Sequence, residues 1–224
     1  MNGRHILRSP LRWGIAGLVG AMAADLAETV VDPANSGNAT RIYDAALDHH
    51  AAMVVSASLL LLSSAAIVPG VIGVVRSFDG RARVLGRIAQ TFALLGAIGH
   101  GALAGVYLLW ASIPGSGANR AQLIHLIDHM NSAPALALIF PLFIAFPVAL
   151  LATNVAAVQA RRAPRWVLVT AVGALAFAIV HPVSDRFATS GALLCLIAAA
   201  VGVATGPVTL RQTGSALEAA ELAA

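Results

Sequence analysis

Several stretches of this chain are long enough to cross a bilayer and carry almost no charge. Residues 51–75, for example, contain no Asp, Glu, Lys or Arg. About 20 consecutive apolar residues span the hydrocarbon core of a membrane as an α-helix. Of the 224 residues, 58% are hydrophobic and 11% are charged, against about 25% charged in a soluble domain. These values disfavour a soluble globular enzyme, a disordered chain and a coiled coil, and they favour an all-α transmembrane helix bundle.

The apolar periodicity predicts about six spans in one bundle domain, over residues 1–210, followed by a short cytoplasmic tail at 211–224. The expected spans are 11–31, 40–75 (apolar over 51–75), 88–112, 134–159, 166–181 and 190–206. Asn38 or Thr40 is the expected cap of the second helix, and Pro69 with Gly70 predicts a kink in it. A short amphipathic helix is expected on the outer side at 119–130.

Arginine supplies all 14 of the Lys and Arg residues. Eleven of these 14 lie near the N-terminus, in the loops at 76–87 and 160–165, or in the tail. The positive-inside rule then places both termini in the cytoplasm, as expected for a multi-pass protein of the cell membrane. Because these arginines lie in short loops, they indicate orientation in a lipid bilayer and not binding to nucleic acid. The absence of Lys excludes Schiff-base chemistry.

Acids and histidines gather toward the opposite, outer side of the predicted bundle. Ionisable side chains at membrane depth usually face the bundle interior or a water-filled cavity. We therefore expect a polar crevice that opens outward. Its candidate members are Asp25, Glu28, Asp32, Asp44, Asp48, Asp128 and Asp185, with His49, His50, His100, His125, His129 and His181.

Helical spacing places many of these groups on shared faces. The alternative is that they only make the interhelical hydrogen bonds common in membrane bundles. The expected stripes are Ala21, Asp25, Glu28 and Asp32 on the first span; His49, Met53, Ser56, Leu60 and Ser63 on the second; Gly96, His100, Ala104 and Tyr107 on the third; and Thr170, Phe177, His181 and Ser184 on the fifth.

Glu28 and Asp25 are the leading candidates for catalytic acids. Both fall in the outer third of the hydrocarbon region, where a carboxyl group held protonated near neutral pH can act as a general acid or proton carrier. The alternative is that the side chains of Glu28 and Asp25 only extend to the outer membrane–water interface. Asp185 is a further candidate acid, and His181 and His100 could orient groups or relay protons. This set predicts an enzyme that acts on a lipophilic small molecule, for example by isoprenoid cyclisation or isomerisation.

The segment 122–129 offers a candidate metal site. His125 and His129 have the i, i+4 spacing by which one helix presents two ligands to one ion. Imidazole with carboxylate suits zinc or non-haem iron. The third ligand could come from His49, foremost, or from His50, His100 or His181. The alternative is an interfacial helix whose polar face is wet. Haem ligation by His100, among glycines, is a further and less favoured option, and a chain without any cofactor also stays open.

Part of the layout resembles known membrane proteins. The turn Arg76-Ser77-Phe78-Asp79-Gly80-Arg81 and the Gly-rich third span resemble small polytopic membrane proteins of high-GC actinobacteria, over most of the chain, and this resemblance implies no activity. The size, the acids and the helix count also resemble the small membrane-bound terpene cyclases of meroterpenoid pathways. That resemblance implies lyase or isomerase chemistry by membrane-facing carboxyls, but those proteins typically have seven spans.

Three further expectations follow from spacing. Arg41 lies three residues before Asp44, which predicts an ion pair on the helix surface. The pair Gly101 and Gly105 and the run Gly14, Gly17 and Gly20 predict close helix contact or a homodimer. Two other functional classes stay open beside an enzyme, namely a proton- or metal-coupled carrier and a structural or accessory membrane subunit without catalysis.

Overall fold

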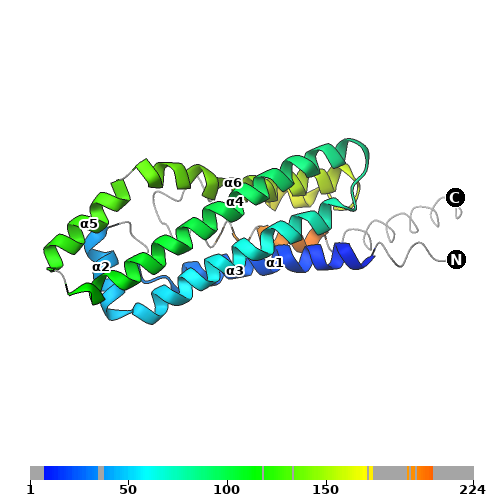
Figure 1. The fold of residues 1–224 in the computed structure, drawn as a ribbon. Helices are drawn as coiled ribbons and strands as arrows, with labels where there is room; N and C mark the ends of the chain where they lie inside the picture. The colour runs from blue at the N-terminus through cyan, green and yellow to red at the C-terminus, as the bar shows by residue number, and fades with distance from the viewer. Residues whose placement is uncertain are drawn as a thin grey trace, which may run out of the picture.

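The computed structural model describes residues 8–34, 38–117, 119–132, 134–170, 172–173, 191, 193–194 and 196–203. In this part of the chain the secondary structure is helical, with turns and without strands (Figure 1). The all-α expectation is therefore confirmed there. Three helical segments are long and apolar enough to cross a membrane, namely Leu11–Val31, His50–Val75 and Gly80–Ser116.

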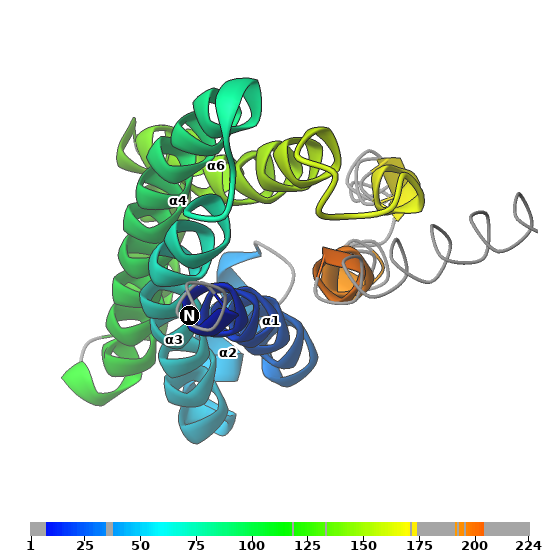
Figure 2. The ribbon, with the colours of Figure 1, turned by 90° about the vertical axis from the view of Figure 1, so that its right-hand side faces the viewer.

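Four long helices form the body of the molecule. The elements are α1 (Arg8–Val31), α2 (Ala39–Asp48), α3 (His50–Val75), α4 (Gly80–Ser112), the 3-10 helix η1 (Ile113–Ser116), α5 (Arg120–Ser132) and α6 (Pro134–Gln159). Viewed along the bundle, α1, α3, α4 and α6 follow one another around its wall (Figure 2). Because α1 and α4 each pack antiparallel to α3, they run parallel to each other.

Two helix boundaries differ from the expectation. A single helix from residue 40 to 75 is wrong, because the backbone leaves helical geometry at His49 (φ −131°, ψ 36°) and separates α2 from α3. The expected cap is confirmed, since the Asn38 side chain accepts hydrogen bonds from the backbone N–H groups of Thr40 and Arg41. The third helix begins at Gly80 and not near 88, because the preceding turn needs only four residues.

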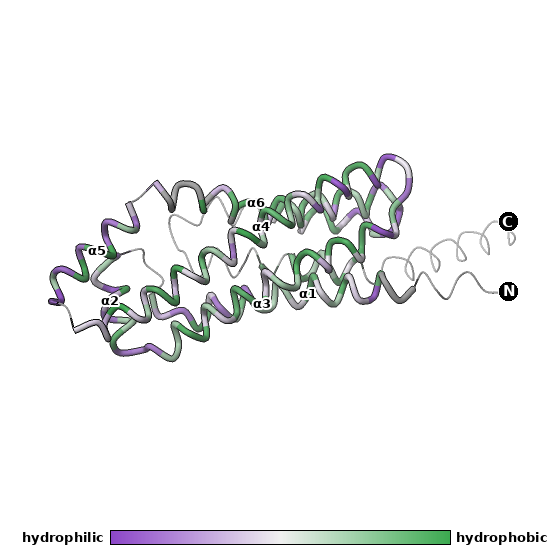
Figure 3. Tube along the Cα trace, viewed as in Figure 1, coloured by the Kyte–Doolittle hydropathy of each residue, from purple (hydrophilic) through white to green (hydrophobic). Residues whose placement is uncertain are grey.

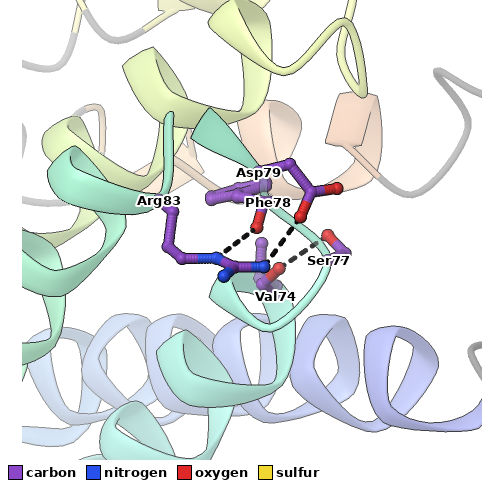
Figure 4. Close-up of polar contacts among 5 residues, drawn as sticks. All are labelled: Val74, Ser77, Phe78, Asp79 and Arg83. Atoms are coloured by element: carbon purple, nitrogen blue, oxygen red, sulfur yellow. Dashed lines mark hydrogen bonds and ion pairs between the residues drawn. The ribbon is translucent and has the colours of Figure 1, made fainter. Parts of the chain in front are cut away.

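The turn between α3 and α4 is closed by its own side chains (Figure 4). Arg83 donates from Nε to the Phe78 carbonyl oxygen at 3.1 Å and from Nη2 to Asp79 Oδ1 at 2.7 Å. The Ser77 hydroxyl donates to the Val74 carbonyl oxygen at 2.7 Å. Phe78 is fully buried beneath the turn. These contacts satisfy backbone carbonyls where the helix ends and hold α3 and α4 as a hairpin.

Glycines bring the backbones of α1 and α3 into direct contact. A Cβ atom at Gly14 would lie 2.6 Å from the Val74 nitrogen, and one at Gly70 would lie 2.8 Å from the Leu18 nitrogen. Small residues permit this approach, and dispersion contacts between the backbones then stabilise it. The expected close helix contact is confirmed at Gly14 and Gly17. It is wrong at Gly101 and Gly105 within the described residues, where the nearest atom to either Cβ position is Ser64 Oγ at 3.8 Å. A homodimer stays a prediction.

The buried apolar residues form two separate clusters. The main cluster joins α1, α3, α4 and α6 with the helical residues 167 and 196–203. The cap cluster joins α2, η1 and α5 to one end of α3 and α4, which we call the cap end. Hydrophilic residues gather at the two ends of the bundle, and the long helices between them are mainly hydrophobic (Figure 3). Large apolar side chains, including Leu61, Leu94 and Ile98, are exposed along those helices.

An ion pair ties the two short helices of the cap together. Arg120 on α5 donates from Nη2 to Asp44 Oδ1 on α2 at 2.8 Å, and its guanidinium lies 5.4 Å from the ring centroid of Tyr43. The hydrogen bond to Asp44 raises the pKa of Arg120 above its ordinary value. The expected Arg41–Asp44 pair is therefore wrong, because Arg120 reaches Asp44 from a helix that is distant in sequence.

The glycine contacts give a direct test of this packing. We expect Gly14→Ala to lower the free energy of unfolding by about 1–3 kcal/mol, because the new methyl group would meet the α3 backbone. Gly20→Ala is the matched control, since nothing lies within 4 Å of its Cβ position. Unfolding of the detergent-solubilised protein followed by circular dichroism measures both. Equal stabilities of the two variants would contradict the contact.

Candidate functional site

Two polar contacts join α1 to α4 near the cap end. Asp25 Oδ2 lies 3.3 Å from His100 Nε2, and Asp32 Oδ2 accepts a hydrogen bond from the Tyr107 hydroxyl at 2.8 Å. Asp25 and Asp32 are seven residues apart, and so are His100 and Tyr107, which corresponds to about two helical turns. Because α1 and α4 are parallel, this equal spacing repeats one contact at two levels. We call these levels the His100 layer and the Tyr107 layer.

Hydrogen bonding in the His100 layer defines where a proton must lie. His100 is 1% exposed, and its Nδ1 lies 2.9 Å from the Gly96 carbonyl oxygen. A carbonyl oxygen only accepts, so Nδ1 carries hydrogen and Nε2 faces the carboxyl group of Asp25. The His100 ring packs on Phe146, with centroids 4.5 Å apart.

The Tyr107 layer fixes the end of α1. Asp32 Oδ1 accepts from the Ala34 backbone N–H at 2.9 Å while Oδ2 accepts from Tyr107. Both carboxylate oxygens therefore have donors, and the chain leaving α1 is held against α4. The Tyr107 ring packs on Trp110, with centroids 5.3 Å apart. This layer is thus a polar contact enclosed by the cap cluster.

Glu28 lies between the two layers on the same face of α1. Its side chain is half-buried and interacts electrostatically with Asp32, Asp25 and Tyr107. Three carboxyl groups thus occupy two turns of one helix face. Like charges so close in a low-dielectric interior oppose one another strongly.

The register of α3 against α1 adds a serine to each layer. A Cβ atom at Gly70 would contact Leu18. In the same antiparallel register, Ser63 is level with Asp25 seven residues further along, and Ser56 is level with Asp32 fourteen residues further along. Both serines are fully buried. Their hydroxyl oxygens, and Asp25 Oδ1, have no hydrogen-bond partner among the described residues. The register thus sets a serine of α3 at the level of each layer, with no hydrogen bond from that serine to the acid or the ring group among the described residues.

The layers end at an apolar level. One further heptad toward the middle of the bundle, the corresponding positions are Leu18, Gly70 and Ala93, which are all buried. Leu18 and Ala93 belong to the main cluster. The polar groups of α1 and α4 are therefore stacked toward the cap end and are bounded on the other side by close-packed apolar residues.

The structure brings three of the predicted catalytic residues together and leaves two untested. Asp25, Glu28 and His100 share the site described above. Asp185 and His181 lie outside the described residues. Asp32 was expected in the crevice but not as a catalytic residue, and Tyr107 was expected only on an interior stripe. The signal that could have identified them is the equal seven-residue spacing of Asp25 with Asp32 and of His100 with Tyr107.

The predicted metal ligands lie at the surface of the cap. His125 and His129 are exposed on α5, and His49 is exposed where α2 meets α3. Among the residues that the structure describes, no group of three or more His, Cys, Asp or Glu side chains is arranged to hold a metal ion. The metal site therefore stays a sequence-based hypothesis.

No protein family model, curated protein or solved structure matches the chain. The geometry of the layers and the physical chemistry of their side chains are consequently the basis for any inference about function.

The Tyr107 layer can be tested by removing one oxygen atom. We expect Tyr107→Phe to lower the free energy of unfolding by about 1–3 kcal/mol, because Asp32 Oδ2 would stay buried without its donor. Tyr43→Phe is the matched control, because its ring faces Arg120 and its hydroxyl makes no hydrogen bond in the described structure. A double-mutant cycle of Tyr107→Phe with Asp32→Asn measures the coupling. Additive effects in that cycle would contradict a direct contact.

Proposed function

We propose that the chain is a multi-pass protein of the cell membrane, with its cap end outward and its arginine-rich turns in the cytoplasm. The support is the length and apolar character of three helices, the apolar side chains exposed along them and the distribution of arginine in the sequence. In this orientation the His100 and Tyr107 layers lie in the outer half of the membrane, under the cap.

The proposed activity is acid–base catalysis on a lipophilic small molecule, such as the cyclisation or isomerisation of an isoprenoid. A carboxyl group of the Asp25, Glu28 and Asp32 set donates a proton to a double bond or oxygen of the substrate. A neighbouring carboxylate then removes a proton from another carbon, so that the protein regains its starting number of protons. His100 holds or returns a proton at Nε2.

The observation that carries this proposal is the pair of matched contacts between parallel helices. Interhelical hydrogen bonds alone would need only one polar group per helix at each contact. Here Glu28 adds a third carboxyl between the two contacts, and Asp25 keeps an oxygen without a donor among the described residues. Clustered carboxyls of this kind are typical of sites that hold and transfer protons.

Solvent deuterium provides a test that works before the substrate is identified. The purified protein is incubated in D2O with a lipid extract, and mass spectrometry detects deuterium at carbon positions that do not exchange spontaneously. We expect incorporation by the wild type and a loss of at least about 100-fold with Glu28→Gln or Asp25→Asn, as is usual when a general acid is removed. The heat-denatured protein gives the background.

Asp48→Asn is the matched control, because Asp48 is exposed on α2 and its loss removes one carboxylate outside the layers. Full incorporation by Glu28→Gln and Asp25→Asn would contradict the catalytic proposal. Incorporation that is lost equally with Asp48→Asn would also contradict it, because the effect would not then come from the layers.

A proton-coupled carrier is the second candidate. The stacking of Asp25, Glu28 and Asp32 along one helix face favours it, because such rows can pass protons along a helix. The apolar level at Leu18 and Ala93 opposes it, since that level interrupts the row. Proteoliposomes with a pH-sensitive dye inside distinguish the two. Proton flux that Glu28→Gln abolishes would favour the carrier, and deuterium incorporation without flux would favour the enzyme.

A further inference from the structure

Exposed arginines are concentrated at the end of the bundle opposite the cap. We call this set the basic end. It consists of Arg12, Arg76, Arg81, Arg87, Arg161, Arg162 and Arg165. None of the seven forms an ion pair with an acid among the described residues. The one acid in the adjoining turns, Asp79, is already paired with Arg83 (Figure 4).

Helix packing brings these arginines to one level. A Cβ atom at Gly96 would lie 2.8 Å from the backbone of Phe146, and one at Gly86 would lie 2.5 Å from Val75. These two contacts fix antiparallel registers in which the start of α4 lies beside the end of α6 and beside the end of α3. Both turns lie at the same end of the molecule (Figure 1), and the buried residues Phe78 and Ala163 share one apolar cluster beneath them.

Arg161 occupies a backbone conformation that favours glycine. Its φ is +53°, and it ends α6 in a hydrogen-bonded pattern in which Arg161 N donates to the Val158 carbonyl and Arg162 N to the Ala157 carbonyl. Glycine is the usual residue at the left-handed position of such a helix end, because a Cβ atom is strained there. Arg161 is exposed at this position.

Stabilisation of helix ends does not explain the whole set. Arginine near the end of α6 interacts favourably with that helix dipole, but Arg81 and Arg83 lie in the first turn of α4, where positive charge is unfavourable. Asp79 also makes no capping hydrogen bond there. The first turn of α4 therefore directs backbone N–H groups toward the same region as the guanidinium groups, an arrangement that favours an anion.

We propose that the basic end binds the phosphate of an anionic phospholipid headgroup, with Arg161 as one of its contacts. The planar guanidinium group matches phosphate oxygens in pairs, and basic sites between membrane helices on the cytoplasmic side suit anionic lipids. This inference rests on the proposed placement in a membrane, but it is independent of the proposed chemistry at the layers.

The strain at Arg161 makes an unusual test possible, because one substitution should raise stability and lower lipid affinity. The full chain is reconstituted in phosphatidylcholine with and without phosphatidylglycerol, and its melting temperature and its lipid affinity by native mass spectrometry are measured. We expect Arg161→Gly to melt about 2 °C or more above the wild type in phosphatidylcholine. We expect its affinity for phosphatidylglycerol to fall about fivefold, the effect of one arginine near an anionic surface.

Arg41→Gln is the matched control, because it removes one exposed arginine at the cap end, and it should leave the affinity for phosphatidylglycerol unchanged. Arg161→Lys keeps a charge and should keep part of the affinity. The proposal is overturned by an unchanged affinity in Arg161→Gly, by an equal loss in Arg41→Gln, or by an equal stabilisation of the wild type with soluble glycerol phosphate or short DNA.

The experiment distinguishes failure of the membrane placement from failure of the lipid site. If the chain does not insert into phosphatidylcholine vesicles, the membrane placement itself is overturned, and with it both proposals. If it inserts but shows no preference for phosphatidylglycerol, only the lipid site is overturned.

Discussion

Backbone contact between α1 and α3 is the constraint on which the polar layers depend. With glycine at positions 14, 17 and 70, the two helices approach so closely that any sliding would drive a Cβ atom into the opposite backbone. The register is therefore set by sterics in the apolar half of the molecule. Its consequence appears two to four turns away, where the same register brings Asp25 and Asp32 level with the serines of α3.

The parallel direction of α1 and α4 turns this register into a site. Antiparallel partners with the same sequence spacing would reverse the order of the ring groups, and Asp25 would then face Tyr107. In the observed arrangement the acid with one oxygen that lacks a hydrogen-bond partner among the described residues faces an imidazole. The acid with two donors faces a phenol. The Tyr107 layer anchors the end of α1, and the His100 layer joins α1 to α4 two turns closer to the middle of the bundle. Glu28 connects them.

Periodicity was sufficient to predict what depends on a single helix. The interior faces that carry Asp25 and His100 follow from 3.6-residue spacing, and the described part of the chain confirms them. Contacts between helices did not follow from the sequence, because spacing does not say which helices are neighbours. Asp44 pairs with Arg120, 76 residues away, and not with nearby Arg41. The break at His49 was also missed, since no glycine or proline marks it.

The two apolar clusters have a consequence for how the molecule comes apart. His100 packs on Phe146, a member of the main cluster, while Tyr107 and Trp110 belong to the cap cluster. The two polar levels thus belong to different cooperative units. Separation of α2 and α5 from the bundle would release the Tyr107 level to solvent and leave the His100 level packed. Hydrogen exchange should consequently proceed from the cap inward, and the contact between Asp25 and His100 should be the last to meet bulk water.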